Sequence, residues 1–310
     1  MTSLCVVEVG DERADDVRAV IGRAFGARPR LDPPSTALEE TTESVASGLG
    51  AAGGLLVLHD GAPVGAAMFD TAERPGRLGL RRVSVDPAHQ GHGVASALVG
   101  VAEEVAELRG LDGVWLTARA ELPDTVSFWL RRGYVETGCE GPSLELAKTL
   151  ELVCPLPSAA DTRAFGARLA ELLRAGDLVV LTGGLGAGKT TLTQGLGEGL
   201  RVRGAVTSPT FVISRVHAST DGGPELVHVD AYRLGAAAEL DDLDLDSTLP
   251  DAVTVVEWGE GLAEGLADSW LEIGLTWPGG AVDGTDPREV RVRPIGARWA
   301  ATPLRSTLLG

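Results

Sequence analysis

Residues 178–192 read LVVLTGGLGAGKTTL. An apolar run, Leu178–Leu181, leads into a glycine-rich segment with the pattern GxxxxGK[ST], and a helical stretch begins at Thr190. In this context the glycines let successive N–H groups point inward at a phosphate, and the helix N-terminus adds the positive end of its dipole. Lys189 can reach the β- and γ-phosphates, and the Thr190 hydroxyl can bind Mg²⁺. The motif residues expected to hold the nucleotide are Gly183, Gly186, Ala187, Gly188, Lys189 and Thr190.

The alternative interpretation of this segment is a strand-to-helix turn without a ligand. Lysine is scarce in the chain, because only Lys148 and Lys189 occur among 27 basic residues, so a lysine at this place is informative. We expect Lys189 to be an exposed loop residue. It should contribute little to stability and much to stabilising charge on the transferred phosphoryl group.

Two acidic residues end apolar strands downstream of the loop. Asp230 follows Leu226–Val229, and Glu257 follows Val253–Val256. In a parallel sheet the carboxyl ends of neighbouring strands meet at one edge, where carboxylates can serve a bound metal and a water molecule. Either residue alone could be a solvated strand end, although the pattern favours a role in the site. Two of them in one domain beside a phosphate loop favour a site.

Four motifs follow one another in this half of the chain: GGLGAGKTTL (183–192), TSPTF (207–211), HVDAYRL (228–234) and VEWGE (256–260). Their order and spacing resemble the TsaE family, the ATPase component of bacterial tRNA threonylcarbamoyladenosine biosynthesis. The resemblance covers residues from about 150 to 293. The family loop usually reads GDLGAGKT, and Gly184 stands here in place of the acid, a change that we expect the loop to tolerate.

The resemblance implies roles for individual residues. Thr190 and Glu257 would bind Mg²⁺ beside ATP, the residues from Gly186 to Thr191 would surround the phosphates, and Asp230 would be needed for hydrolysis. The segment Ser208–Thr210, with Thr210 among the catalytic residues, would act as a switch. Trp258 would lie beside the nucleotide, with residues 158–162 on the adenine side. The implied partners are TsaB- and TsaD-like subunits, with tRNA reached only indirectly.

A small-molecule or nucleotide kinase is the rival within the same fold. Such kinases usually carry a lid that brings several arginines onto the transferred phosphoryl group. The arginines in this region are scattered: Arg201, Arg203, Arg215 and Arg233. Because no clustered lid segment is apparent, the ATPase interpretation is favoured.

The first half of the chain holds a second candidate site. Residues 83–95 read VSVDPAHQGHGVA and contain the pattern [QR]xxGx[GA] between a strand and a helix that begins at Val94. Small residues let the backbone approach a ligand, and the helix N-terminus offers N–H groups to a pyrophosphate. The pattern alone is compatible with a plain turn. The residues expected to hold acetyl-CoA are Val85, Gln90, Gly91, Gly93, Val94 and Ala95.

The order of elements around that pattern, ending with FWLRRGY (128–134), resembles the GNAT acetyltransferases over residues 3–148. That family commonly has a tyrosine that protonates the departing thiolate, and the matching position here is Trp129. The general base of the ribosomal-protein acetyltransferases falls at Thr117. Glu121 and Asp124 lie nearby, but solvated acids are the favoured interpretation, as are exposed loop imidazoles for His89 and His92. Binding of acetyl-CoA with slow transfer is therefore expected.

The length predicts two domains, and the alternation of strand and helix signals predicts that both are α/β. The resemblances imply a GNAT-like mixed α/β domain over 1–149 and a phosphate-loop NTPase domain over 150–310. The net charge of −17 gives neither half a basic face for nucleic acid. Three separated cysteines indicate neither a disulfide framework nor a zinc site. The N-terminus lacks the features of a signal peptide, and no run approaches a membrane span, so a cytoplasmic protein without membrane contact is expected.

Apolar periodicity predicts the individual elements of both halves. The expected strands are 4–9, 55–59, 63–69, 78–85, 114–118, a pair within 134–150, 152–158, 178–182, 211–216, 225–229, 253–256, 270–276 and 289–293. The expected helices are 11–25, 36–49, 94–108, 125–132, 159–173 and 190–200. A hairpin turn is expected at Asp60-Gly61.

The function that fits these observations best is a two-domain fusion in which ATP hydrolysis supports threonylcarbamoyl transfer to tRNA adenosine. Two alternatives concern the first domain. It could be an acyl-CoA sensor or scaffold without catalysis, which Trp129 favours. The chain could also be an acetyltransferase whose second domain only responds to nucleotide, which the complete set of phosphate-loop motifs makes the weakest interpretation.

Overall fold

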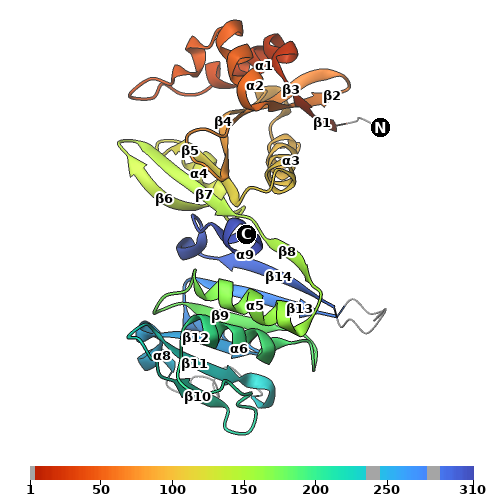
Figure 1. Ribbon diagram of the computed structural model, residues 1–310. Helices are drawn as coiled ribbons and strands as arrows, with labels where there is room; N and C mark the ends of the chain where they lie inside the picture. The colour runs from red at the N-terminus through yellow and green to blue at the C-terminus, as the bar shows by residue number, and fades with distance from the viewer. Residues whose placement is uncertain (1–3, 235–244, 278–286) are drawn as a thin grey trace. The chain divides into compact units, whose positions relative to one another are not determined.

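The computed structural model describes residues 4–234, 245–277 and 287–310. The chain divides into two compact units, Met1–Lys148 and Thr149–Gly310, which we call the first and the second unit (Figure 1). Both are α/β, as predicted. Within the described ranges, no helix has the length and apolar character that crossing a membrane requires.

Over its described residues the first unit is built on a seven-stranded sheet with the order β1-β2-β3-β4-β5-β7-β6. Its strands are β1 (Leu4–Val9), β2 (Gly54–His59), β3 (Ala62–Asp70), β4 (Arg77–Val85), β5 (Gly113–Arg119), β6 (Val135–Glu140) and β7 (Ser143–Thr149). Asp60 and Gly61 form the predicted turn between β2 and β3, with φ of 50° and 82°. Positive φ at both central residues matches the twist of an antiparallel hairpin.

In the described part of this unit, four α-helices pack on the sheet: α1 (Ala14–Gly26), α2 (Thr42–Ala52), α3 (Val94–Leu108) and α4 (Pro123–Leu130). The single helix predicted over 36–49 is wrong in its start, because residues 36–39 form a separate 3-10 turn. Thr41 begins α2 instead: its side chain accepts from the Ser44 N–H, and the Ser44 hydroxyl accepts from the Thr41 N–H. This reciprocal capping fixes the start of the helix at Thr42.

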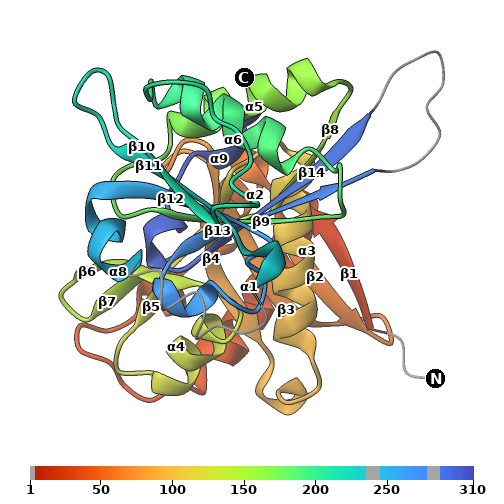
Figure 2. The same ribbon diagram turned by 90° about the horizontal axis from the view of Figure 1, so that it is seen from below.

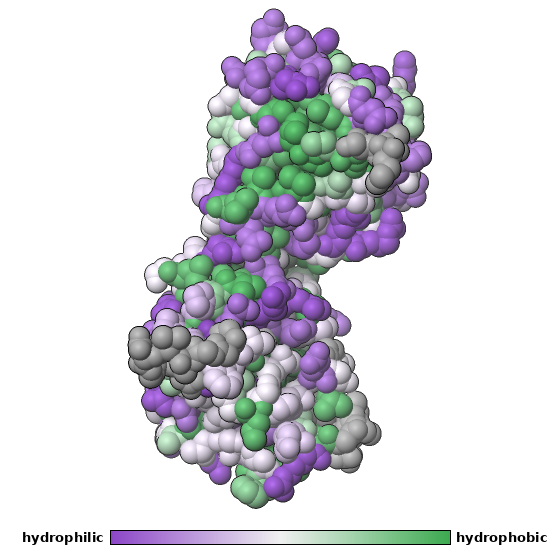
Figure 3. Space-filling view, turned by 90° about the vertical axis from the view of Figure 1, so that its right-hand side faces the viewer, coloured by the Kyte–Doolittle hydropathy of each residue, from purple (hydrophilic) through white to green (hydrophobic). Residues whose placement is uncertain are grey.

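Strands β4 and β5 run parallel, but their pairing stops at Leu80 and Leu116. Beyond that point β4 continues to Val85 and β5 to Arg119 without pairing to each other. The sheet therefore opens between their carboxyl ends. On the face drawn in Figure 3, apolar residues of this unit gather in one broad area bordered by hydrophilic ones.

The described residues of the second unit form another seven-stranded sheet, with the order β10-β11-β12-β9-β13-β14-β8. Its strands are β8 (Leu152–Leu156), β9 (Leu178–Thr182), β10 (Ser214–His217), β11 (Glu225–Asp230), β12 (Ala252–Glu257), β13 (Trp270–Thr276) and β14 (Arg288–Ile295). Strands β11, β12, β9 and β13 are parallel neighbours, and the outer pairs are antiparallel. The carboxyl ends of β11, β12 and β9 therefore meet at one edge.

Helices α5 (Ala159–Ala170) and α6 (Lys189–Gly199) lie side by side on one face of this sheet (Figures 1 and 2). Two glycines allow the close approach, since a Cβ at Gly195 would lie 1.9 Å from the Arg163 carbonyl and one at Gly166 would lie 2.3 Å from that of Leu192. Helix α9 (Leu304–Leu309), which the sequence did not predict, packs into the same core cluster, and α8 (Leu245–Thr248) packs on the other face.

The strand predicted over 211–216 is partly wrong. Strand β10 begins only at Ser214, because Val212 and Ile213 donate their N–H groups to the Pro209 carbonyl at 2.8 and 2.7 Å. Ile213 also has φ of 66°, which a strand does not allow. The apolar run therefore begins as a turn, and Phe211 is 86% exposed.

Candidate functional site

The glycine-rich loop joins β9 to α6. Gly183 has φ of 132°, and a Cβ there would lie 2.3 Å from the Leu275 carbonyl oxygen, so only glycine fits. Gly188 precedes α6 in the left-handed region, with φ of 106°. Arg288 on β14 fixes the loop from the side by donating to the carbonyls of Gly186 and Ala187 at 3.2 and 3.1 Å.

Lys189 is 5% exposed, so the expectation of an exposed loop lysine is wrong. It is the first residue of α6, and its side chain folds back under the loop. The ammonium donates to the carbonyls of Gly183 and Gly184 at 2.7 and 3.0 Å and lies 3.8 Å from the Trp258 ring centroid. Burial lowers the pKa of Lys189, and the charges of Glu257 and Asp230 oppose that shift. A desolvated ammonium can form a strong charge-assisted hydrogen bond to an anion.

Asp230 and Glu257 are paired directly across β11 and β12. Both are buried, with 4% and 3% exposure. The Thr190 hydroxyl donates to the two carboxylate oxygens of Glu257 at 3.0 and 3.3 Å. The two carboxylates and the loop hydroxyl therefore lie at one edge of the sheet, as the sequence pattern predicts.

A buried histidine lies behind Glu257. Its Nε2 is 2.9 Å from Glu257 Oε1, and His228 is fully buried. A carboxylate oxygen can only accept, so Nε2–H is the donor. Sequence reasoning missed His228 as a site residue. The signal was its place two residues before Asp230 on one strand, which puts both side chains on the same face.

Asp230 holds the segment that contains Ser208 and Thr210. The Thr210 and Ser208 hydroxyls donate to Asp230 Oδ2 at 2.5 and 3.2 Å, and the two hydroxyl oxygens lie 2.6 Å apart. Its Oδ1 accepts from the Tyr232 N–H at 3.1 Å. Two hydroxyls of this segment therefore converge on one carboxylate oxygen.

Trp258 follows Glu257 with φ of 61°, and its N–H donates to the Leu181 carbonyl at 2.9 Å. Tyr232 packs on its ring, with centroids 5.2 Å apart. Together these groups border a cavity of about 330 Å³, which we call the loop cavity. Its lining is Leu185, Gly186, Ala187, Gly188, Lys189, Thr190, Thr191, Ser208, Thr210, Asp230, Tyr232, Glu257 and Trp258.

Two predicted groups lie outside that lining. Gly183 shapes the base of the loop and touches β13 instead. Among residues 158–162, Thr162 lies beside the glycine-rich loop, since a Cβ at Gly188 would be 3.7 Å from Thr162 Cγ2. Ser158 caps α5 by accepting from the Asp161 N–H, so its side chain already has a structural role.

The donors at the loop cavity suit Mg²⁺. Among the described residues no three His, Cys, Asp or Glu side chains form a group that could hold a metal by themselves. Mg²⁺ is usually bound through one or two carboxylates together with substrate phosphates and water, so a complete protein cage is not required. The Thr190 hydroxyl against the Glu257 carboxylate provides hard oxygen donors beside the loop.

The first unit has a cavity of about 810 Å³ at the start of α3, which we call the α3 cavity. All six residues expected to hold acetyl-CoA border it: Val85, Gln90, Gly91, Gly93, Val94 and Ala95. Gly91 and Gly93 have φ of 78° and 80° and would meet no neighbour with a Cβ. Glycine is needed there for the left-handed backbone as well as for close approach.

The position at which the resemblance expects a tyrosine is buried in the structure. Trp129 on α4 is 3% exposed, borders the α3 cavity, and packs edge-on against Tyr134 with centroids 4.9 Å apart. Tyr134 does not line this cavity. Burial raises the pKa of its phenol well above the ordinary value, and the nearby Glu103 carboxylate raises it further. Because its phenol does not line the cavity, Tyr134 is not placed to protonate a thiolate there.

Some of the acidic and histidine side chains near the α3 cavity line it, and others do not. Glu121 accepts from the Arg119 guanidinium at 2.7 Å and does not line the α3 cavity. Asp124 and His89 do line it, and His92 Nδ1 lies 2.8 Å from the Gln90 carbonyl. Thr117 is exposed and borders a second cavity between β4 and β5.

Both halves of the chain are similar to known protein families. Residues 156–279 match the model of the threonylcarbamoyl adenosine biosynthesis protein TsaE, and residues 23–134 match that of the acetyltransferase (GNAT) family. Both resemblances inferred from the motifs are thereby confirmed.

Individual proteins of known name also resemble the two halves of the chain. The tRNA threonylcarbamoyladenosine biosynthesis protein TsaE of Streptomyces coelicolor is 59% identical over 149 residues, which is 48% of this chain and 99% of the relative. The protein of the same name from Mycobacterium tuberculosis H37Rv is 53% identical over 127 residues, covering 39% and 76% of the two chains. The PaiA N-acetyltransferase of Thermoplasma acidophilum, solved with coenzyme A, shares 14% identity, with a TM-score of 0.41 and coverage of 46% and 97%.

Proposed function

This chain belongs to the TsaE family through its second unit, and from that membership we propose that it hydrolyses ATP with Mg²⁺ in support of threonylcarbamoyl transfer to tRNA adenosine. The observation that carries the proposal is the convergence of Lys189, Thr190, Glu257 and Asp230 on the loop cavity. A phosphate loop alone would serve many reactions. The two buried strand-end carboxylates add what hydrolysis requires.

Thr190 and Glu257 are the residues that would hold Mg²⁺, which neutralises charge on the phosphates when bound. Lys189 would exchange its contacts with the Gly183 and Gly184 carbonyls for phosphate oxygens. His228 keeps Glu257 Oε1 oriented by its hydrogen bond. A fixed carboxylate is preferable here because a preorganised group costs no reorganisation during the reaction.

Asp230 would orient the attacking water and couple the reaction to the segment that Ser208 and Thr210 anchor. Both hydroxyls reach the same carboxylate oxygen, Oδ2. A water or a metal-bound ligand competing for that oxygen would release the segment. The reaction at the loop cavity would in this way change the surface next to it.

The proposed partners are TsaB- and TsaD-like subunits. Phe211 and Val212 follow the switch segment directly and are 86% and 57% exposed, so a partner could sense its position. Contact with tRNA would be indirect, because the chain carries a net charge of −17 and phosphate binding depends on cationic side chains.

A product analysis tests the proposal against a kinase. We expect the full-length chain to convert ATP to ADP and inorganic phosphate only when Mg²⁺ is present, without any phosphoryl acceptor. The measurement is chromatography of nucleotides together with phosphate release. ATP turnover that requires a sugar or nucleoside, with the label recovered on that compound, would establish the kinase instead.

For the first unit we propose acetyl-CoA binding in the α3 cavity with slow acetyl transfer to an acceptor. The unit is a GNAT-family domain. The binding half rests on Gly91, Gly93 and the N-terminus of α3, which do not depend on Trp129. The slow half rests on the absent phenol, because leaving-group protonation contributes about 10²- to 10⁴-fold.

Gly93→Glu should weaken acetyl-CoA binding at least about 10-fold, because it places a carboxylate against a pyrophosphate and forces a left-handed backbone on a residue with a side chain. Calorimetry on the full-length protein measures the affinity. Gly110→Glu is the matched control, since Gly110 has φ of 69° in the turn after α3 and open space around it. Equal affinities of both variants and the parent protein would remove Gly93 from the acetyl-CoA site, and no binding by the parent protein or by Gly93→Glu would make the unit a scaffold. If Trp129→Tyr leaves transfer unchanged, the missing acid was not the limit.

A further inference from the structure

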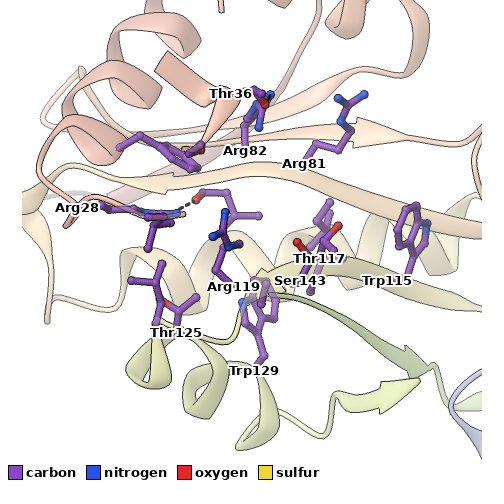
Figure 4. A pocket seen from close by; sticks show the side chains of 18 of the residues that line it. Arg28, Thr36, Arg81, Arg82, Trp115, Thr117, Arg119, Thr125, Trp129 and Ser143 are labelled. Atoms are coloured by element: carbon purple, nitrogen blue, oxygen red, sulfur yellow. Dashed lines mark hydrogen bonds between the residues drawn. The ribbon is translucent and has the colours of Figure 1, made fainter. Parts of the chain in front are cut away.

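The opening between β4 and β5 contains a cavity of about 390 Å³, which we call the β4–β5 cavity (Figure 4). Leu80, Trp115 and Leu116, where the pairing of the two strands ends, contribute apolar lining. Trp129 and Thr125 border both this cavity and the α3 cavity. The two cavities therefore share a wall.

Arginines dominate the charged lining of the β4–β5 cavity: Arg28, Arg81, Arg82 and Arg119. Glu73 is the one acidic residue among the described residues that line it. Figure 4 shows Arg28 and Arg119 in the opening between the two strands, and Arg81 and Arg82 on β4 itself. A concentration of positive charge in a chain of net charge −17 calls for a physical reason.

Two of these arginines have acidic partners beside β4. Arg82 donates through Nε to Glu40 at 2.8 Å and also to the Thr36 hydroxyl at 3.0 Å. Arg81 lies 3.6 Å from Asp70 and is largely exposed. Both therefore have counter-charges within the protein.

Arg119 holds the chain segment that borders the cavity. It pairs with Glu121 at 2.7 Å and donates to the carbonyls of Pro33 and Asp32 at 2.7 and 2.8 Å. Its guanidinium is therefore committed to fixing that segment. The role is structural and leaves little donor capacity for a ligand.

Arg28 differs from the other three. Among the described residues no carboxylate lies within ion-pair distance of it. Its guanidinium lies 3.8 Å from the Phe25 ring centroid and makes one long contact, 3.4 Å, to the Val83 carbonyl. Burial lowers its pKa. A desolvated guanidinium with most of its five donors free of such partners is suited to a planar anion.

We propose that the β4–β5 cavity receives the acyl acceptor and that this acceptor is a small amino acid with an apolar side chain, whose carboxylate pairs with Arg28. The fork of one guanidinium matches one carboxylate in two parallel hydrogen bonds. The apolar lining from Leu80, Trp115 and Leu116 matches the side chain. The volume of about 390 Å³ lies within the range of sites that bind small molecules.

This inference rests on the proposed acetyl-CoA binding of the first unit for its chemistry. The acceptor's amine nitrogen would attack the thioester carbonyl carbon and form the amide bond as the carbon–sulfur bond breaks. The nitrogen loses a proton, and the departing thiolate gains one. Binding of the amino acid itself does not require the transfer, so the two can fail separately.

Arg28 also borders the α3 cavity, so its anion could instead belong to CoA. The experiment separates these sources. Full-length protein saturated with CoA is titrated by calorimetry with L-phenylalanine and L-leucine and with their α-carboxamides. The affinity for CoA is measured in parallel. The variants are Arg28→Gln and, as the matched control, Arg81→Gln, which neutralises an exposed arginine of the same cavity.

We expect each amino acid to bind at least about 10-fold more tightly than its amide, because a charge-assisted pair is lost in the amide. Arg28→Gln should remove that preference without changing the CoA affinity, and Arg81→Gln should retain it. Three results would overturn the proposal: equal or no binding of acids and amides, a preference that survives Arg28→Gln, or a loss confined to CoA binding. Amino-acid binding that depends on Arg28 without acetyl transfer would retain the amino-acid site and remove its role as the acyl acceptor.

Discussion

Lys189→Met should lower ATP hydrolysis by about 10²- to 10³-fold, the loss typical of removing one preorganised group from developing charge. The ammonium is desolvated and held between two loop carbonyls and the Trp258 ring. Phosphate oxygens would meet it without reorganisation of solvent. Methionine is chosen over alanine because the side chain is 5% exposed and its volume must be kept.

Steady-state phosphate release measures the effect, and thermal unfolding shows whether the variant folds. The chain supplies its own control: Lys148→Met changes the only other lysine, which pairs with Glu103 at 2.8 Å in the first unit. Hydrolysis should persist in this control. Undiminished hydrolysis in a folded Lys189→Met protein would remove the phosphate-loop assignment.

Glu257→Gln should raise the Mg²⁺ concentration required for half-maximal hydrolysis by at least about 10-fold and lower the maximal rate. Mg²⁺ strongly prefers charged oxygen ligands, and glutamine keeps the shape without the charge. The amide oxygen can still accept from His228 and from the Thr190 hydroxyl. The fold should therefore be retained, and the change should appear in the metal dependence.

The measurement is a Mg²⁺ titration of ATP hydrolysis. Glu272→Gln is the matched control, since Glu272 lies on β13 of the same sheet and pairs with Arg293 away from the loop cavity. An unchanged Mg²⁺ midpoint in Glu257→Gln would make Glu257 a structural strand end. Its contacts with Thr190 and His228 would then serve only the packing of β11 and β12.

Apolar periodicity predicted the strands that carry the residues of the loop cavity. Strand β9 matches its expected bounds, and the register that pairs Asp230 with Glu257 follows from two apolar strands ending in acids. These features are local, because a buried parallel strand is a continuous apolar run. The turn over Val212 and Ile213 was mispredicted because hydrogen bonds to Pro209 override an apolar run.

The missed features of the site depend on contacts between distant segments. Lys189 is buried because its side chain lies under the Trp258 ring, 69 residues away by number, and no local pattern shows this. Arg288 reaches the loop from β14, which is distant from the loop in the sequence. Arg28 stands out only when the acidic partners of Arg81, Arg82 and Arg119 are known. Sequence reasoning found the residues of the chemistry but not the groups that position them.

The measurement that tests the central claim most directly is a reconstituted tRNA-modification assay in which the full-length chain replaces TsaE beside the other components. We expect threonylcarbamoyladenosine to form over repeated cycles with the parent chain and Lys148→Met, and to stop with Lys189→Met. Formation of the modified nucleoside that does not depend on the added chain, or that is equally strong with Lys189→Met, would contradict the account.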